Sequence, residues 1–248
     1  MNVPSKPVFL CIFAAMALVL QVGPSYAQDM GLQLGDDGSI SARTIQLFAL
    51  VTVLSLAPGI AIMVTCFPFL VTVLSILRQA IGLQQSPPNM LIVSLALFLT
   101  YFIMEPVFLA AWQNGITPLT NEEIDIETAF LRTLEPFRVF MANRMDPDTF
   151  YAMAELRPDT IDETPTADAP LSVLVPSFML SEISRAFQIG FLIYLPFLII
   201  DLVVAAILMS MGMMMVPPAV VSLPFKLAFF VVADGWSLIA GSLVRSYF

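Results

Sequence analysis

Four long apolar stretches constrain this chain more than any other feature. The first, Ile45–Leu77, runs for 33 residues without a charged side chain. The others are Met90–Ala111, Val173–Val216 and Leu223–Val244. A helix needs about 20 apolar residues to cross a bilayer. Because 58% of the residues are apolar and only 12% are charged, the chain has too little polar surface for a soluble fold of this length. We therefore expect an all-α membrane protein with about four apolar helical stretches.

The N-terminus has the layout of a secretory signal. Lys6 precedes the apolar run Val8–Leu20, which Gly23-Pro24 interrupts. Ser25-Tyr26-Ala27 then places small residues before a cleavage point. The alternative is an uncleaved anchor, but thirteen residues are fewer than the about 20 that a span needs. We expect a cleavable signal peptide over 1–27 and a mature chain that begins outside the cytoplasm.

One hydrophilic segment carries nearly all of the net charge of −9. Residues 113–170 hold twelve acidic residues and four arginines, a balance of 4 − 12 = −8. No run of lysines and arginines occurs in the sequence, so we expect no nucleic-acid binding. Four spans return the chain to the side where it began. We therefore expect this segment and both mature termini on the periplasmic side.

The acidic segment shows signs of a helix. Thr120-Asn121-Glu122-Glu123 fits a capping box with threonine at the N-cap. After it, apolar residues recur at helical spacing: Phe130, Leu134, Phe137, Met141 and Met145. We expect a helix here, kinked or split at Pro136.

The sequence offers no constellation for catalysis. Histidine is absent, and the two cysteines, Cys11 and Cys66, are far apart. The commonest general base and the commonest metal ligand are therefore missing. We expect no enzyme activity, no catalytic residues, no metal site and no cofactor.

Five charged residues interrupt the last two apolar stretches: Glu182, Arg185, Asp201, Lys226 and Asp234. Each would cost about 2.5–3.5 kcal/mol if it faced lipid at the centre of a span. They either form a proton or ion pathway or make inter-helix or inter-subunit ion pairs. We favour pairing, because no dense relay of acids accompanies them. Lys226 has no acid three or four residues away, and we expect Glu182 of another helix or subunit as its partner.

Methionine is concentrated at one point. Five of seven residues are methionine: Met209, Met211, Met213, Met214 and Met215. Pro217-Pro218 follows directly. Methionine side chains are flexible and polarisable, so a ring of them would keep a pore dry yet deform around a passing chain. A buried turn between two helices is the alternative, and both interpretations stay open here.

These motifs together resemble the FliP family. The resemblance is carried, in order, by the run from Leu77 to Asn89 (LRQAIGLQQSPPN), Ala186–Phe191, Leu195–Val204, Met209–Pro218, Ser222–Lys226 and Asp234-Gly235-Trp236. It covers essentially the whole mature chain and is weakest in the acidic segment.

The resemblance implies a pore-forming core subunit of the bacterial flagellar type III protein export gate. In that family about five copies assemble with FliQ and FliR, and FlhA and FlhB are further partners. The helices pack as inclined hairpins in an oligomeric, helical pore in the inner membrane, within the flagellar basal body. Unfolded flagellar proteins are the export substrates. The pore gate would correspond to Met213, Met214 and Met215.

The chain departs from the family at two places. The family often reads Ser-Phe-Thr-Arg where this chain has Cys66-Phe67-Pro68-Phe69, so a cation is missing. It also often has lysine at the position of Ser184, whereas the cation here is Arg185. Family ion pairs that use these cations are expected to be rearranged.

Two other functions compete with the export gate. An ion-coupled transporter or an intramembrane aspartyl protease would use Asp201 and Asp234. The sequence lacks an internal repeat, which transporters commonly show. Gly-Asp occurs only at Gly35-Asp36, outside the apolar stretches. We expect four parts: a signal peptide (1–27), an arm with a first helical hairpin (28–112), the acidic segment (113–170) and a C-terminal hairpin with a methionine-rich turn (171–248).

Overall fold

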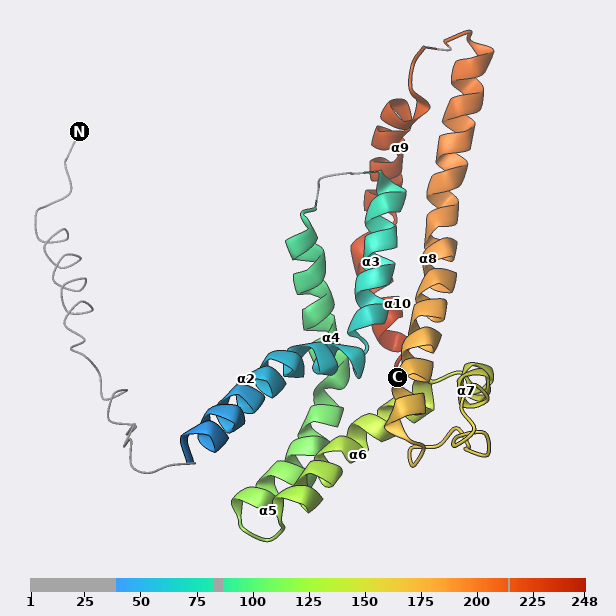
Figure 1. Ribbon diagram of the computed structural model, residues 1–248. Coiled ribbons are helices and arrows are strands. Elements are labelled where there is room, and N and C mark those ends of the chain that lie inside the picture. The colour runs from blue at the N-terminus through green and yellow to red at the C-terminus, as the bar shows by residue number, and fades with distance from the viewer. Residues whose placement is uncertain (1–38, 83–86, 214) are drawn as a thin grey trace, which may run out of the picture. The chain divides into compact units, whose positions relative to one another are not determined.

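The computed structural model describes residues 39–82, 87–213 and 215–248, and they are mostly helical (Figure 1). No strand occurs among these residues, which confirms the all-α expectation. The elements are α2 (Ser39–Met63), α3 (Phe67–Ile81), α4 (Asn89–Ala111), the π-helix η1 (Trp112–Ile116), α5 (Thr117–Thr120), α6 (Ile126–Arg144), α7 (Pro147–Ala154), α8 (Leu171–Ser210), α9 (Pro218–Val232) and α10 (Gly235–Arg245). The predicted signal peptide lies outside the described residues.

The chain divides into two units, Met1–Ser55 and Leu56–Phe248, and the boundary falls within α2. The described large apolar side chains of α2 are exposed. A helix that is apolar all round belongs in a membrane or against another chain. The helix begins at Ser39, before the apolar stretch that starts at Ile45.

The first apolar stretch forms two helices rather than one long kinked one. Pro58 lies inside α2 and does not end it. The break falls between Met63 and Phe67, where Pro68 occupies the first turn of α3. Proline is tolerated at that position because the first backbone N–H groups of a helix have no intrahelical acceptor.

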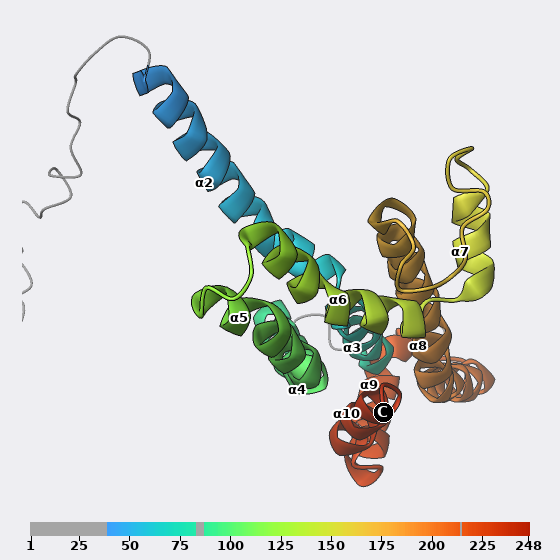
Figure 2. The ribbon, with the colours of Figure 1, turned by 90° about the horizontal axis from the view of Figure 1, so that it is seen from below.

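α3 forms the centre of the second unit. Its buried face consists of Phe69, Leu70, Val73, Leu74, Leu77, Ala80 and Ile81. Figure 2 shows α4 on one side of α3, α8 on another, and α9 with α10 on a third, and α3 contacts α4, α8 and α9. The helix ends at Gly82, whose φ of 88° is left-handed. Glycine adopts this conformation without steric cost.

α8 and α9 form a hairpin that is joined by the methionine-rich turn (Figure 1). α8 has 40 residues and continues through Pro176 and Pro196. At 1.5 Å per residue it is about 60 Å long, twice the hydrocarbon thickness of about 30 Å. The turn lies at the end of the hairpin farthest from the C-terminus.

The last apolar stretch is also two helices. α9 starts at Pro218, before the expected Leu223, and α10 follows after a bend of 60°. Ala233 and Asp234 form the break.

The acidic segment folds into η1, α5, α6, α7 and turns. The expected capping box is wrong: Thr120 ends α5, and α6 begins at Ile126 with Asp125 as its N-cap. The Thr128 N–H donates to the Asp125 carboxylate at 3.4 Å. Hydrogen bonds from Thr128 lower the pKa of Asp125.

Two of the five residues in the predicted apolar stripe, Met141 and Met145, are buried. Met141 and Met145 lie in a core with α7 and α8, and Phe137 packs against the main core. Phe130 is 61% exposed. Pro136 lies inside α6 and does not split it.

Arg138 orders the loop that precedes α8. Its Nη1 donates to the carbonyl oxygens of Ala167 at 2.9 Å and Ala169 at 3.1 Å. The loop that is rich in proline, aspartate and threonine is therefore fixed to α6.

Two helical segments among the described residues, Asn89–Thr120 and Leu171–Ser210, are long and apolar enough to cross a membrane. The number rises to four if each bent pair, Leu47–Met63 with Phe67–Ile81 and Pro218–Val232 with Gly235–Arg245, counts as one span. The expectation of about four apolar helical stretches in a membrane protein is confirmed.

The contact of α3 with α8 depends on Gly190. A Cβ built on Gly190 would lie 2.4 Å from Cδ1 of Ile76. Real Cβ contacts do not approach so closely, so any side chain here would push Ile76 aside or separate the helices.

We predict that Gly190→Ala lowers the stability of the detergent-solubilised protein by about 1–3 kcal/mol, the usual cost of overpacking. Adding Ile76→Ala should recover part of the loss, because the methyl groups in the way are removed. Thermal unfolding measures both effects. Gly59→Ala is the control, since nothing lies within 4 Å of its Cβ. Equal destabilisation by Gly59→Ala and Gly190→Ala would contradict the close packing.

Candidate functional site

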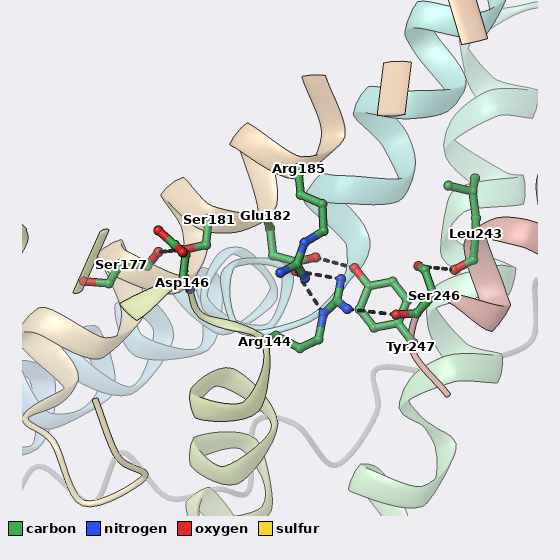
Figure 3. Close-up of polar contacts among 9 residues, drawn as sticks. All are labelled: Arg144, Asp146, Ser177, Ser181, Glu182, Arg185, Leu243, Ser246 and Tyr247. Carbon is green, nitrogen blue, oxygen red and sulfur yellow. Dashed lines mark hydrogen bonds and ion pairs between the residues drawn. The ribbon is translucent and has the colours of Figure 1, made fainter. Parts of the chain in front are cut away.

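A fully buried carboxylate, Glu182 on α8, is the centre of one polar cluster (Figure 3). Arg144, the last residue of α6, approaches it with Nη2 at 3.1 Å and Nε at 3.2 Å. Arg185 lies 3.5 Å away through Nη1. The phenol of Tyr247 donates to the other carboxylate oxygen. Three segments far apart in sequence therefore meet at one acid.

The C-terminus is held in the same cluster. Arg144 Nη1 donates to the carbonyl oxygen of Ser246 at 2.8 Å. The guanidinium carbon of Arg144 lies 4.0 Å from the centre of the Tyr247 ring, a cation–π contact. That ring also packs against Phe69 of α3 and Phe140 of α6. Burial and the nearby Glu182 carboxylate raise the pKa of the Tyr247 phenol.

Asp146 extends this network toward α7. Its N–H donates to Ser181 Oγ at 3.0 Å, and its carboxylate accepts from the Thr149 N–H at 3.0 Å as the N-cap of α7. Hydrogen bonds from Thr149 and the charge of Arg185 lower the pKa of Asp146. Glu182 and Asp146 thus balance the charges of Arg144 and Arg185.

A second cluster joins the hairpin to α3. Lys226 on α9 is buried, and its Nζ lies 2.6 Å from the Asp201 carboxylate on α8. Ser222 Oγ donates to the same carboxylate at 2.6 Å. Lys226 Nζ also donates to the carbonyl oxygen of Ala80 at 3.1 Å. The last carbonyl groups of a helix have no intrahelical donor and favour a cation, so Lys226 caps the C-terminus of α3.

This geometry corrects one predicted pair. Within the described chain Lys226 is paired with Asp201, and Glu182 with Arg144 and Arg185. Asp201 lies on α8, opposite Lys226 on α9 in the hairpin that the two helices form. The intrachain pair was missed because spacing along the sequence does not reveal which residues of an antiparallel hairpin are opposite. A pair between Lys226 and Glu182 of a neighbouring subunit stays a prediction.

Asp234 differs from the other four charged residues. It occupies the break between α9 and α10 and makes no ion pair with any residue that the structure describes. Its carboxylate does not cap α10. Its φ of 46° is left-handed, a conformation that costs free energy for a residue other than glycine.

The methionine-rich turn is exposed on this chain. Met213 is 38% exposed and Met215 is 98% exposed, and Met209 and Met211 are also exposed. Gly212, with φ of 76°, allows the chain to turn after α8. Met214, the third methionine expected in the gate, lies outside the described residues. The described methionines do not pack as a buried turn within this chain.

Sequence reasoning missed Arg144, Tyr247 and Ser222. Arg144 and Tyr247 lie outside the apolar stretches, where polar residues are common and do not stand out as candidate site residues. Ser222 lies four residues before Lys226, on the same helix face, and this spacing is a signal that could have found it. Among the residues described, no group of three or more acidic or cysteine side chains could hold a metal ion.

Exposed apolar helices with their charges paired between helices define an integral, all-α membrane protein. The sequence model of the FliP family matches residues 50–243. The flagellar biosynthetic protein FliP of Caulobacter vibrioides is 47% identical over 243 residues, which cover 98% of this chain and 91% of that protein. FliP of Agrobacterium fabrum is 53% identical over 214 residues (85% and 86%). FliP of Bacillus subtilis is 46% identical over 210 residues (83% and 93%).

The chain therefore belongs to the FliP family. It is a component of the flagellar export apparatus, and it lies in a membrane. Membership in that apparatus implies assembly with other flagellar export proteins.

We predict that Lys226 and Asp201 depend on each other. Lys226→Asp or Asp201→Lys alone should reduce the amount of assembled complex on native gels, because each places two like charges together. Breaking a fully buried pair costs about 3–5 kcal/mol. Because Asp201 is partly exposed, we expect about 1–3 kcal/mol here.

The double variant Lys226→Asp with Asp201→Lys should restore part of the assembly. The matched comparison is Lys226→Glu with Glu182→Lys, which should restore none. Better rescue by the change at Glu182 would mean that the pair observed within one chain is not the one used in the assembly.

Proposed function

We propose that this chain is a pore-forming core subunit of the flagellar type III protein export gate, and that it passes unfolded flagellar proteins across the inner membrane. The observation that carries the proposal is the methionine-rich turn, which is exposed at the tip of the α8–α9 hairpin. Exposed apolar side chains at such a tip need a partner surface. Equivalent tips from neighbouring copies would supply it.

The chemistry of the turn suits a seal. Met213, Met214 and Met215 from several copies would surround one axis with unbranched thioether side chains. A narrow apolar constriction excludes water and therefore ions. The same side chains have several rotatable bonds, so they can move apart for an extended polypeptide. Glycine at 212 accommodates the left-handed backbone with which the chain turns after α8.

The two polar clusters support the hairpin that carries the turn. Lys226 ties α8, α9 and the end of α3 together, while Glu182 ties α8 to α6 and the C-terminus. Arg185 keeps 35% of its side chain exposed, which leaves donors for a neighbouring subunit. We propose that Glu182, Arg185, Asp201 and Lys226 position the helices of the assembly rather than conduct protons.

The apolar surface provides room for partners. An apolar cleft of about 390 Å³ lies between α8 and α9 and includes Ile199, Val203, Ile207 and Phe225. We propose that such surfaces pack against other copies of this chain, about five in all, and against FliQ and FliR, with FlhA and FlhB nearby. The contacts of Asp201 with Lys226 and Ser222, which join α8 to α9, support a structural role in a gate over a role in an ion-coupled transporter.

The proposed orientation places residues 113–170 and both mature termini in the periplasm, in a subunit of the flagellar basal body. We predict that cysteines at Thr164 and Phe248 react with a membrane-impermeant thiol reagent in intact spheroplasts. A cysteine at Gln79, at the end of α3, should react only after lysis. The native Cys66 is fully buried and gives little background. Reaction of the Thr164 position only after lysis would invert the topology.

We predict that replacing Met213, Met214 and Met215 by alanine leaves the complex assembled but leaky. The change removes bulk without adding polarity, so the closed pore widens and fills with water. Ion leakage across the membrane of cells that express the variant measures the effect, and some protein export should remain.

The matched control compares two double variants. One carries Met213→Ala and Met215→Ala, and the other carries Met63→Ala and Met90→Ala. All four side chains are exposed on this chain, but only the first two lie in the turn. Loss of assembly without leakage in the turn variant would mean that these methionines pack a subunit interface. The gate would then lie elsewhere.

A further inference from the structure

A cleft of about 420 Å³ opens where α9 bends into α10. Its lining combines the end of α3 with both sides of the bend, and its walls are apolar, with Ile81, Phe230 and Trp236 among them. The volume lies within the range of about 300–1,000 Å³ that is usual for small-ligand pockets. The cleft is separate from both polar clusters and from the methionine-rich turn.

Two opposite charges line this apolar cleft, Arg78 and Asp234. Neither forms an ion pair with any residue in the part of the chain that the structure describes. The Arg78 guanidinium donates to the side-chain oxygen of Asn89, which uses one of its five N–H groups. The Asp234 carboxylate accepts no hydrogen bond from the described residues. Both groups are therefore available to a ligand.

The position of Asp234 is enforced by packing. A Cβ on Gly235 would lie 2.2 Å from Cε2 of Phe230, so the backbone at the bend rests directly on that ring. The Phe230 and Trp236 rings meet edge to face, with centroids 5.4 Å apart. Asp234 is thereby held in a left-handed conformation. Strain of this kind, retained at a cleft by the surrounding packing, points to a function for the side chain.

We propose that this cleft binds a phospholipid whose headgroup carries both a phosphate and a primary ammonium group. Arg78 binds the phosphate, since a guanidinium fork matches phosphate oxygens, and Asp234 accepts from the ammonium. An acyl chain lies against Ile81 and Phe230. Trp236 adds an aromatic ring to the wall of the cleft.

The charges of Arg78 and Asp234 together favour one class of ligand over others. A lipid with a purely anionic headgroup would satisfy Arg78 but face the Asp234 carboxylate. A cationic side chain from a neighbouring subunit would satisfy Asp234 but leave Arg78 without a counter-charge. A zwitterionic headgroup satisfies both with a single ligand. The inference rests on the membrane placement of the chain and not on its role in the pore.

The test is native mass spectrometry of the purified full-length protein in its extracted complex. Phosphatidylethanolamine, phosphatidylcholine and phosphatidylglycerol with identical acyl chains are added separately. We expect phosphatidylethanolamine to be retained best, because the quaternary ammonium of phosphatidylcholine cannot donate a hydrogen bond. Asp234→Asn should weaken phosphatidylethanolamine binding by about two- to fivefold, as for a partly exposed ion pair. It should not weaken phosphatidylglycerol binding.

Arg78→Gln should weaken the binding of both of those lipids. Asp148→Asn and Arg157→Gln are the matched controls, since both lie in the acidic segment, away from the cleft, and should change nothing. If Arg78→Gln does not fold, Asp234→Asn alone carries the test, because the Asp234 carboxylate makes no ion pair and no capping hydrogen bond among the described residues. Equal retention of the three lipids would overturn the proposal. Dissociation of the complex by Asp234→Asn with unchanged lipid binding would also overturn it, and would assign the carboxylate to a neighbouring subunit.

Discussion

The need to neutralise charge inside an apolar helical protein organises the second unit of this chain. Glu182 is fully buried, and an isolated carboxylate there would be prohibitively costly. Two arginines and a phenol surround it, and they come from α6, from α8 and from the C-terminus. Each donor must stay in place for the buried acid to keep its partners. The contacts of α6, α8 and the C-terminal residues are therefore mutually dependent, and Phe69 of α3 joins them through the Tyr247 ring.

Features encoded locally could be predicted from the sequence, and features that depend on distant partners could not. The four apolar stretches and the turn at Pro217-Pro218 follow from composition and helix-breaking residues. The partner of Lys226 does not, because Asp201 is 25 positions away in sequence and opposite only in the folded hairpin. The start of α6 shows the limit even for local rules. Both Thr120 and Asp125 can cap a helix, and the turn that follows α5 decides in favour of Asp125.

Proline marks the start of several helices in this chain, including α3 and α9, but prolines within an apolar or amphipathic run did not end a helix. Pro58, Pro136, Pro176 and Pro196 all lie inside helices, although proline removes a backbone donor and is usually a helix breaker. In an apolar environment an irregular backbone would leave further unsatisfied groups, so remaining helical costs less than breaking. The breaks at Gly82, Gly212 and Asp234 have a left-handed residue, whereas the break between Met63 and Phe67 has none.

The α8–α9 hairpin has two different parts. Charge pairs hold the helices in place near Asp201 and Lys226, whereas the methionine-rich turn is exposed. Buried charge pairs and the cap on α3 resist movement of α8 and α9 near their polar contacts, since separating them would expose charge to an apolar surrounding. At the other end the described methionines have no core to pack against in this chain. A seal must stay closed at rest and yield to a passing chain. In the proposed gate, a stiff support would limit movement to the seal itself, and flexible thioether side chains would keep that movement small. The two ends of one hairpin thus meet opposite mechanical requirements.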